Sequence, residues 1–216
     1  MHEQIEKIYG LPISPFSMRV ELMLRAKGSQ LSLAAPEDGV HSEAFRSQAP
    51  IGKIPAMELK NGRVLGESEV IAEFLEEALQ GPELLPAGAV ARAEARLTAR
   101  IADIYVMNRM LPLFRQLDPS TRDRAIVESA IADVLEGVGW LENQLVSGGE
   151  GKWAPYAVAA VVPIILYVER VLPFFGKTDP LSAAPVLKEL YQSEAGREPA
   201  STVVQSMDEA LSAAGL

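Results

Sequence analysis

The feature that most constrains the fold is a change of apolar pattern near residue 80. Before this point, strand-like segments alternate with segments of helical period, and after it every apolar pattern is helical. A chain of 216 residues is long enough for two domains. We therefore predict an α/β domain over residues 1–80, a linker over 81–88 that contains proline and glycine, and an all-helical domain over 89–216.

The first domain is expected to run β-α-β and then β-β-α. Ile5 to Tyr9 reads as the first strand, and a helix starts at Pro15 and stops at Gly28. The stretch LSLAA, residues 31–35, reads as a short second strand. Within residues 55–68, Met57 to Lys60 and Arg63 to Leu65 flank Asn61-Gly62, a pair that readily adopts a type I′ turn, so this stretch predicts a β-hairpin.

The second half of the chain predicts five helices. They begin near residue 89, near Thr121, at residue 155, near 182 and near 199. The third is the most apolar, with no charge from Trp153 to Val168. That stretch is 16 residues long and contains two prolines, whereas a membrane span needs about 20 apolar residues. We therefore expect a buried helix of a soluble domain.

Composition excludes several classes of function. The chain has no cysteine, so disulfides, thiolate metal sites and a protein thiol nucleophile are excluded. Only two histidines are present, which speaks against a histidine-rich metal site. A net charge of -9 without a Lys/Arg cluster disfavours nucleic acid as the main partner. The charged N-terminus lacks the pattern of a secretory signal and predicts a cytoplasmic protein.

Ser14 lies at the predicted turn from strand to helix. A serine N-cap followed by proline at the first helical position is a favourable helix start, worth about 1 kcal/mol, so capping alone explains this residue. The same place offers free backbone N–H groups and the positive end of the helix dipole, which favour an anion. Both readings stay open from these residues alone.

Two further segments have a structural and a functional reading. Pro55 suits the start of an edge strand, but a proline there, cis or trans, also leaves the backbone of Ile54 able to pair with a peptide-like ligand. Glu67 and Ser68 precede an apolar stripe of helical period and fit helix capping. They also fit an amino-acid headgroup, with Ser68 on its carboxylate and Glu67 on its ammonium group.

The order and spacing of these segments closely resemble the cytosolic glutathione transferases, especially the serine-type classes, tau-like or bacterial. The resemblance rests on IYGLPISPFSMRVELMLRAKG, then IGKIPAMELKNG, then LGESEVIAEFLEE, followed by a proline-containing linker and helices. It covers the first domain well and the second mainly in helical layout. It implies a thioredoxin-like domain joined to an all-α domain, a homodimer, glutathione as co-substrate and a detoxifying transferase activity without a metal.

The resemblance also implies roles for individual residues. Ser14 takes the place of the hydroxyl that hydrogen-bonds the glutathione sulfur, with Ser17 as a second candidate one turn along. Ile54, before an expected cis Pro55, would pair with the cysteinyl backbone. Glu67 and Ser68 would bind the γ-glutamyl group of glutathione. Lys53 and, with less support, His41 would bind the glycyl carboxylate.

A hydrophobic electrophile is expected beside the sulfur, between the turn and the inner face of the long helix. The candidate walls are Leu11, Pro12 and Ile13 on the turn, and Tyr105, Met110 and Leu113 on the helix. Helical spacing of this kind is more often plain core. The alternatives are a specialised glutathione-dependent lyase or isomerase, which cleaves ethers or interconverts cis and trans isomers, and a non-catalytic binding protein.

One departure from the family concerns the buried helix. Family members usually begin it with a Ser/Thr-x-x-Asp capping motif, but the matching residues here are Lys152 to Pro155. Both capping side chains are missing. Pro155 is therefore expected to begin the helix at its first position instead.

Overall fold

The computed structural model describes residues 4–49 and 51–216 and divides into two compact units. Unit 1 comprises Met1–Leu84 together with Glu198–Gly215, and unit 2 comprises Leu85–Arg197 with the last residue. The predicted helical domain of 89–216 therefore differs at its end. The C-terminal helix α9 (Ala200–Ala213) packs on α1 (Pro15–Ala26) and so groups with the first unit.

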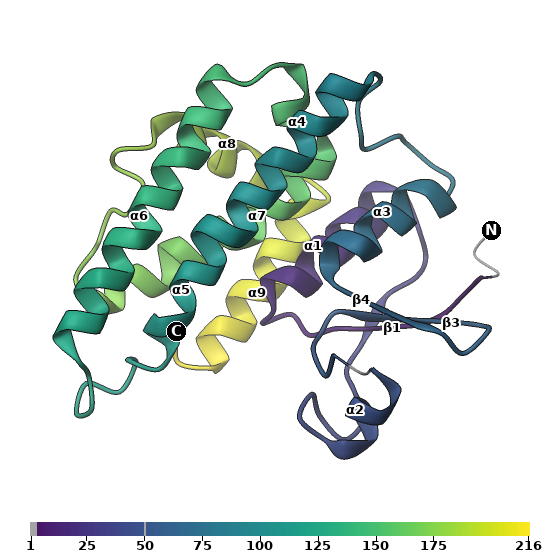
Figure 1. Ribbon diagram of the computed structural model, residues 1–216, viewed down its shortest axis with the longest axis horizontal. Helices are drawn as coiled ribbons and strands as arrows, with labels where there is room; N and C mark the ends of the chain where they lie inside the picture. The colour runs from purple at the N-terminus through teal and green to yellow at the C-terminus, as the bar shows by residue number, and fades with distance from the viewer. Residues whose placement is uncertain (1–3, 50) are drawn as a thin grey trace. The chain divides into compact units, whose positions relative to one another are not determined.

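Unit 1 is a thioredoxin-like mixed sheet flanked by helices. Besides α1 and α9, its elements are β1 (Ile5–Tyr9), β2 (Leu33–Ala34), α2 (Glu43–Gln48), β3 (Ala56–Leu59), β4 (Val64–Gly66) and α3 (Ser68–Ala78). The strand order is β2-β1-β3-β4, with β1 parallel to β2 and the other pairs antiparallel. Figure 1 shows α1 and α3 together on one face of the sheet and α2 on the other.

The predicted first strand and the start of the first helix are confirmed at Ile5–Tyr9 and Pro15. The second strand is shorter than the predicted 31–35, because only Ile8 and Tyr9 pair with it. Helix α2 was not predicted as an element. Its start has a recognisable signal, since the Ser42 hydroxyl accepts a hydrogen bond from the Phe45 N–H at 3.0 Å.

The hairpin is confirmed, but its turn is not type I′. That turn needs positive φ at both central residues, and Asn61 is not among the residues with positive φ. Gly62 has φ 80°, its N–H bonds the Leu59 carbonyl at 2.8 Å, and the Leu59 N–H bonds the Arg63 carbonyl at 2.8 Å. The loop therefore has the three-residue form, in which one glycine supplies the only positive φ.

Unit 2 is helical throughout its regular structure. Its elements are α4 (Ala89–Arg100), η2 (Ile101–Met107), α5 (Asn108–Phe114), α6 (Arg124–Ser147), η3 (Glu150–Trp153), α7 (Pro155–Val171), η4 (Leu172–Phe175) and α8 (Pro185–Ala195). The first three form one continuous helix with a π-helical middle, where the Asn108 N–H bonds the Asp103 carbonyl. At Gly137 of α6 an added Cβ would lie 1.7 Å from the Tyr105 carbonyl oxygen, so only glycine permits this approach.

Helix α7 is the core of unit 2. It begins at Pro155 with no side-chain cap, as the missing capping motif predicts. Residues 155–175 are long and apolar enough to cross a membrane, but 67% of the most apolar window is buried inside the fold. That burial is typical of the core helix of a soluble domain.

The start of α8 is capped from another helix. Ala184 at the N-cap has no side-chain acceptor, and the buried carboxylate of Glu142 on α6 accepts from the Val186 and Leu187 N–H groups at 3.0 and 2.8 Å. A carboxylate at a helix N-terminus also interacts favourably with the positive end of the helix dipole. Glu142 therefore does for α8 what a local serine or aspartate does elsewhere.

Glu142→Ala should lower the free energy of unfolding by about 2–3 kcal/mol, because it leaves one buried and one half-buried N–H group without their acceptor. Glu142→Gln, which keeps one acceptor oxygen, should cost about half as much. Urea denaturation of both variants tests this. Equal stability of Glu142→Ala and the parent protein would contradict the capping role.

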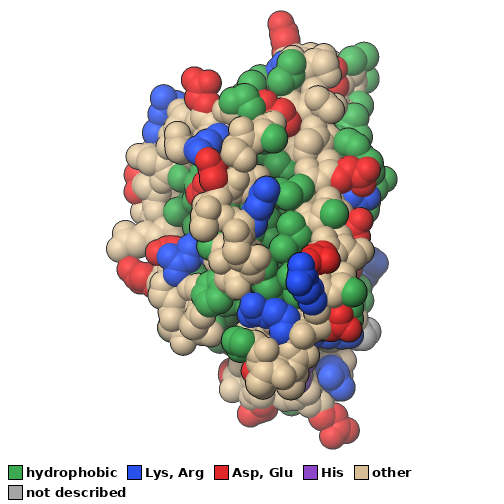
Figure 2. Space-filling view, turned by 90° about the vertical axis from the view of Figure 1, so that its left-hand side faces the viewer, with side chains coloured by type: hydrophobic (Ala, Val, Ile, Leu, Met, Phe, Trp, Pro, Cys, Tyr) green, Lys and Arg blue, Asp and Glu red, His purple; other side chains and the backbone are tan. Residues whose placement is uncertain are grey.

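On the face shown in Figure 2, acidic and basic side chains are interspersed with apolar ones. This distribution accords with an acidic chain that has no Lys/Arg cluster in its sequence.

Candidate active site

Ser14 lies at the junction of β1 and α1 and is the N-cap of the helix. Its backbone is extended, with φ −91° and ψ 119°, and its hydroxyl oxygen accepts a hydrogen bond from the Ser17 N–H at 3.2 Å. The capping reading is therefore confirmed. It leaves the hydroxyl proton for another acceptor, because a serine that accepts one bond can still donate one. The side chain is half-buried, so its surroundings are open to a ligand.

Ser17 has a different environment although it lies one turn away. Its side chain is fully buried, and its hydroxyl has no hydrogen-bond partner among residues 4–49 and 51–216. It faces the end of β1, where a Cβ added to Gly10 would lie 3.1 Å from its oxygen. Of the two hydroxyls, Ser14 is the one with an exposed side.

Glu67 and Ser68 meet at the start of α3 in a strained conformation. Glu67 has φ 65° and ψ 119°, and it is the one non-glycine residue with positive φ in the part of the chain that the structure describes. Such a conformation costs about 1–3 kcal/mol and is concentrated at functional sites. Ser68 begins the helix and is 6% exposed.

Arg19 was not among the residues predicted from the sequence, but it contacts Ser68, which was. It lies on α1, is 2% exposed, and donates to the Ser68 hydroxyl at 3.3 Å and to the Glu69 carboxylate at 2.8 Å. An arginine is almost never fully buried unless it is paired. In the sequence, Arg19 cannot be distinguished from an arginine on the exposed face of a helix. Both of its partners lie about fifty positions later in the chain. Only the sequence run Ser14 to Arg19, on one helix, hints at a shared site.

The segment before β3 has the expected backbone form. The Ile54–Pro55 bond is cis, Pro55 is buried, and Ile54 packs partly against the Tyr9 and Phe45 cluster on the α2 face of the sheet. Within the described residues, the Ile54 backbone has no hydrogen-bond partner. Its N–H and C=O groups are thus available to pair with an extended ligand.

The two residues predicted to contact a ligand carboxylate lie on either side of α2 in the chain. His41 directly precedes the Ser42 cap, and Lys53 follows Gly52, whose φ is 63°. Both side chains are exposed. The structure gives neither of them an ion pair with a described residue.

The predicted walls of the electrophile site differ in exposure. Met110 and Leu113 are fully buried, as core residues are, whereas Tyr105 is 38% exposed. The Tyr105 ring lies edge-on to Trp140 at 5.1 Å, and the Arg109 guanidinium lies 4.6 Å from the Trp140 ring. Arg109 and Trp140 were not predicted, because their contact joins two helices.

On the turn itself, Leu11 and Ile13 are half-buried and Pro12 is exposed. Leu11 and Pro12 line a cavity of about 220 Å³ within unit 1, together with Met18 of α1, Leu33 of β2 and Val203 of α9. The lining also includes the charged side chains of Glu21 and Arg25 on α1 and the hydroxyls of Ser32, Thr202 and Ser206, so the cavity is mixed in polarity.

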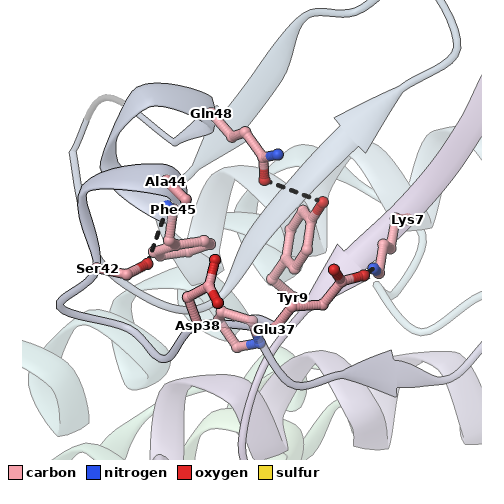
Figure 3. Close-up of a pocket in the computed structure, with 9 residues that line it drawn as sticks. Lys7, Tyr9, Glu37, Asp38, Ser42, Ala44, Phe45 and Gln48 are labelled. Atoms are coloured by element: carbon pink, nitrogen blue, oxygen red, sulfur yellow. Dashed lines mark hydrogen bonds and ion pairs between the residues drawn. The ribbon is translucent and has the colours of Figure 1, made fainter.

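A second cavity of unit 1, of about 90 Å³, lies on the α2 face of the sheet and is polar (Figure 3). The Tyr9 hydroxyl donates to the Glu58 carboxylate at 3.1 Å and approaches Gln48 at 3.4 Å. Burial and then the Glu58 carboxylate raise the pKa of the Tyr9 phenol, so it stays protonated. None of the predicted site residues lines this cavity. Nor does the described part of the chain gather three or more side chains that could hold a metal ion.

Comparison with known proteins agrees with this architecture. The family model for the glutathione S-transferase N-terminal domain matches residues 8–83. A probable glutathione S-transferase of Nicotiana tabacum is 30% identical over 140 residues, which are 64% of this chain and 59% of the tobacco protein. Glutathione S-transferase U3 of Arabidopsis thaliana is 29% identical over 177 residues, or 76% of this chain and 73% of the relative. The tobacco match thus spans little more than half of that protein's length.

The fold agrees over almost the whole chain. A glutathione S-transferase from Methylobacillus flagellatus KT, solved with glutathione bound, superposes with a TM-score of 0.76 over 91% of this chain and 98% of that one, at 20% identity. A similarity at this identity shows the fold, and the family model and the curated relatives supply the sequence match. Residues 8–83 thus match the glutathione S-transferase N-terminal domain, and the chain as a whole has the fold of the glutathione S-transferases to which it is similar.

Proposed function

We propose that the protein is a glutathione transferase that activates the glutathione thiol through Ser14 and transfers the thiolate to a hydrophobic electrophile. The observation that carries this proposal is the hydrogen bonding of Ser14. Its oxygen is occupied by the Ser17 N–H at 3.2 Å, so the proton is left to donate to a sulfur above the turn. The hydrogen bond that the Ser14 oxygen accepts polarises its O–H group and strengthens it as a donor. Together with the N-terminus of α1, this favours an anionic partner.

The energies involved are sufficient. A thiol with its ordinary pKa of about 8.5 is only a few per cent ionised at neutral pH. A hydrogen bond to a charged acceptor contributes roughly 1.5–3 kcal/mol, which corresponds to about one to two pKa units. One hydroxyl, with the helix dipole, therefore brings the bound thiol near half ionisation or beyond.

The proposed reaction has three steps: loss of the thiol proton, attack of the thiolate, and departure of a leaving group or uptake of a proton. The thiol proton leaves to water, Ser14 donates to the resulting thiolate, and the sulfur lone pair forms a bond to an electrophilic carbon. An aryl halide then loses its halide, whereas an activated alkene takes up a proton. The nucleophile belongs to glutathione, which agrees with a chain that has no cysteine.

The rest of glutathione is assigned to the neighbouring elements. The backbone of Ile54, which has no hydrogen-bond partner among the described residues, supports pairing with the cysteinyl residue. The start of α3 at Glu67 and Ser68 supports binding of the γ-glutamyl group. Lys53 and His41, both exposed, are assigned to the glycyl carboxylate. We further propose a cytoplasmic homodimer, following the family resemblance.

Retention on immobilised glutathione, followed by an assay with a generic aryl halide, tests the proposal. The protein should bind the resin, elute with free glutathione and release halide at a rate well above the uncatalysed reaction. Binding without turnover would contradict the transferase and favour a specialised enzyme or a binding protein. Failure to bind glutathione would overturn the proposed function as a whole.

A further inference from the structure

The proposed glutathione site joins the first turns of two different helices, and a buried cation connects them. Ser14 precedes α1, and Glu67 and Ser68 open α3. Arg19 follows Ser14 by five positions, about one and a half helical turns, and its side chain is 2% exposed. It is therefore anchored on the helix that holds the sulfur and reaches the helix proposed for the γ-glutamyl group.

The Arg19 contacts fix the orientation of the Ser68 hydroxyl. A guanidinium can only donate, so at the 3.3 Å contact between Nη1 and the Ser68 oxygen the serine is the acceptor. Among the described residues, this is the hydrogen bond that the Ser68 side chain makes. The serine proton is thus left for a further acceptor. The Glu69 carboxylate at 2.8 Å holds the guanidinium in place.

We propose that Arg19 is a positioning residue for recognition of the ligand α-carboxylate. By occupying the Ser68 oxygen, it directs the Ser68 proton toward the carboxylate of the γ-glutamyl group, and it adds a fixed positive charge to the N-terminus of α3. This inference rests on the proposed function. It goes beyond it in assigning part of the glutathione specificity to a side chain that does not touch the ligand.

A purely structural role is the alternative, because a buried ion pair also ties α1 to α3. The two roles differ in ligand preference. A structural role changes the affinity for any ligand of the site alike. A positioning role changes the affinity only for ligands that carry the α-carboxylate.

The test compares glutathione with an analogue whose γ-glutamyl group lacks the α-carboxylate, by calorimetry at neutral pH. The parent protein should prefer glutathione by about 10- to 100-fold, as expected for a hydrogen bond to a charged group. Arg19→Met should remove most of this preference, and Ser68→Ala should do the same. Arg19→Lys should retain part of the preference for glutathione. Added to Ser68→Ala, Arg19→Lys should cause no further loss of that preference.

Arg124→Met is the matched control, since it makes the same change in an exposed ion pair with Glu128 on α6. It should leave the preference unchanged. Circular dichroism and thermal unfolding establish which variants fold, and if Arg19→Met does not fold, Arg19→Lys and Ser68→Ala decide. An unchanged preference in the Arg19 variants that fold, or in Ser68→Ala, would overturn the proposal. If the parent protein binds both ligands equally, the Arg19 proposal is overturned and the proposed function stands. If the parent protein binds no glutathione, both are overturned.

Discussion

Ser14→Ala should lower the rate of thiolate transfer by about 10- to 100-fold at a pH below the ordinary pKa of the thiol, while glutathione affinity changes by only a few-fold. The variant removes the donor that stabilises the thiolate, so the pKa of the bound thiol rises by about one to two units. In the proposed site most of the glutathione contacts are assigned elsewhere, to Ile54 and the start of α3. Titration of the thiolate absorbance of the bound tripeptide measures the pKa directly.

Ser17→Ala is the natural control for this prediction. It removes the same group one turn along the same helix, but from a buried position where the hydroxyl has no described partner. The pKa of the bound thiol should stay as in the parent protein. Ser14→Ala should also cost about 1 kcal/mol of stability through the lost N-cap, which urea denaturation separates from the catalytic effect. An altered thiol pKa in Ser17→Ala but not in Ser14→Ala would reverse the assignment.

The largest loss of stability is expected from Lys27→Met. The Lys27 ammonium and the Glu76 carboxylate lie 2.6 Å apart and are 2% and 6% exposed. The carboxylate also accepts from the Leu84 N–H at 2.9 Å. Removing the cation leaves a buried charge without its partner, so the free energy of unfolding should fall by about 3–5 kcal/mol.

The double variant Lys27→Met/Glu76→Gln tests whether unpaired charge is the cause. Glutamine is neutral and keeps an acceptor for Leu84, so the double variant should recover most of the lost stability. Lys188→Met, which breaks an exposed pair with Asp179, should cost about 0–1 kcal/mol. Urea denaturation gives all three values. A double variant as unstable as Lys27→Met would mean that the lysine acts through its packing and not through its charge.

Local sequence signals predicted those elements whose cause is local. A serine at the N-cap followed by Pro15 at the first helical position favours a helix start from neighbouring residues alone. The segment Ile5 to Tyr9 forms a strand whose residues Ile5, Ile8 and Tyr9 are buried. The hairpin was found from Asn61-Gly62, but its turn type was wrong. Loop length and pairing of Leu59 with Arg63 decide the turn, and those depend on the register of two strands.

Elements and partners that depend on distant residues were not predictable. Helix α2 has six residues, too few for an apolar period to show. Glu142 caps a helix that begins more than forty positions later, and α9 joins the first unit through its packing on α1. No periodicity in the sequence distinguishes a carboxylate that will cap another helix from one that will face water.

The candidate site shows the same division between local and distant causes. By itself the sequence determined the hydroxyl at a helix start and the acidic and hydroxyl pair at the start of α3, since each is a property of residues next to one another. The absence of any protein thiol follows from composition alone. Only the tertiary structure decided that Ser17 is buried, that Glu67 takes a positive φ, and that Arg19 lies against Ser68. The physical reason is that burial and pairing energies belong to contacts between elements, and the packing of α1 on α3 is what creates them.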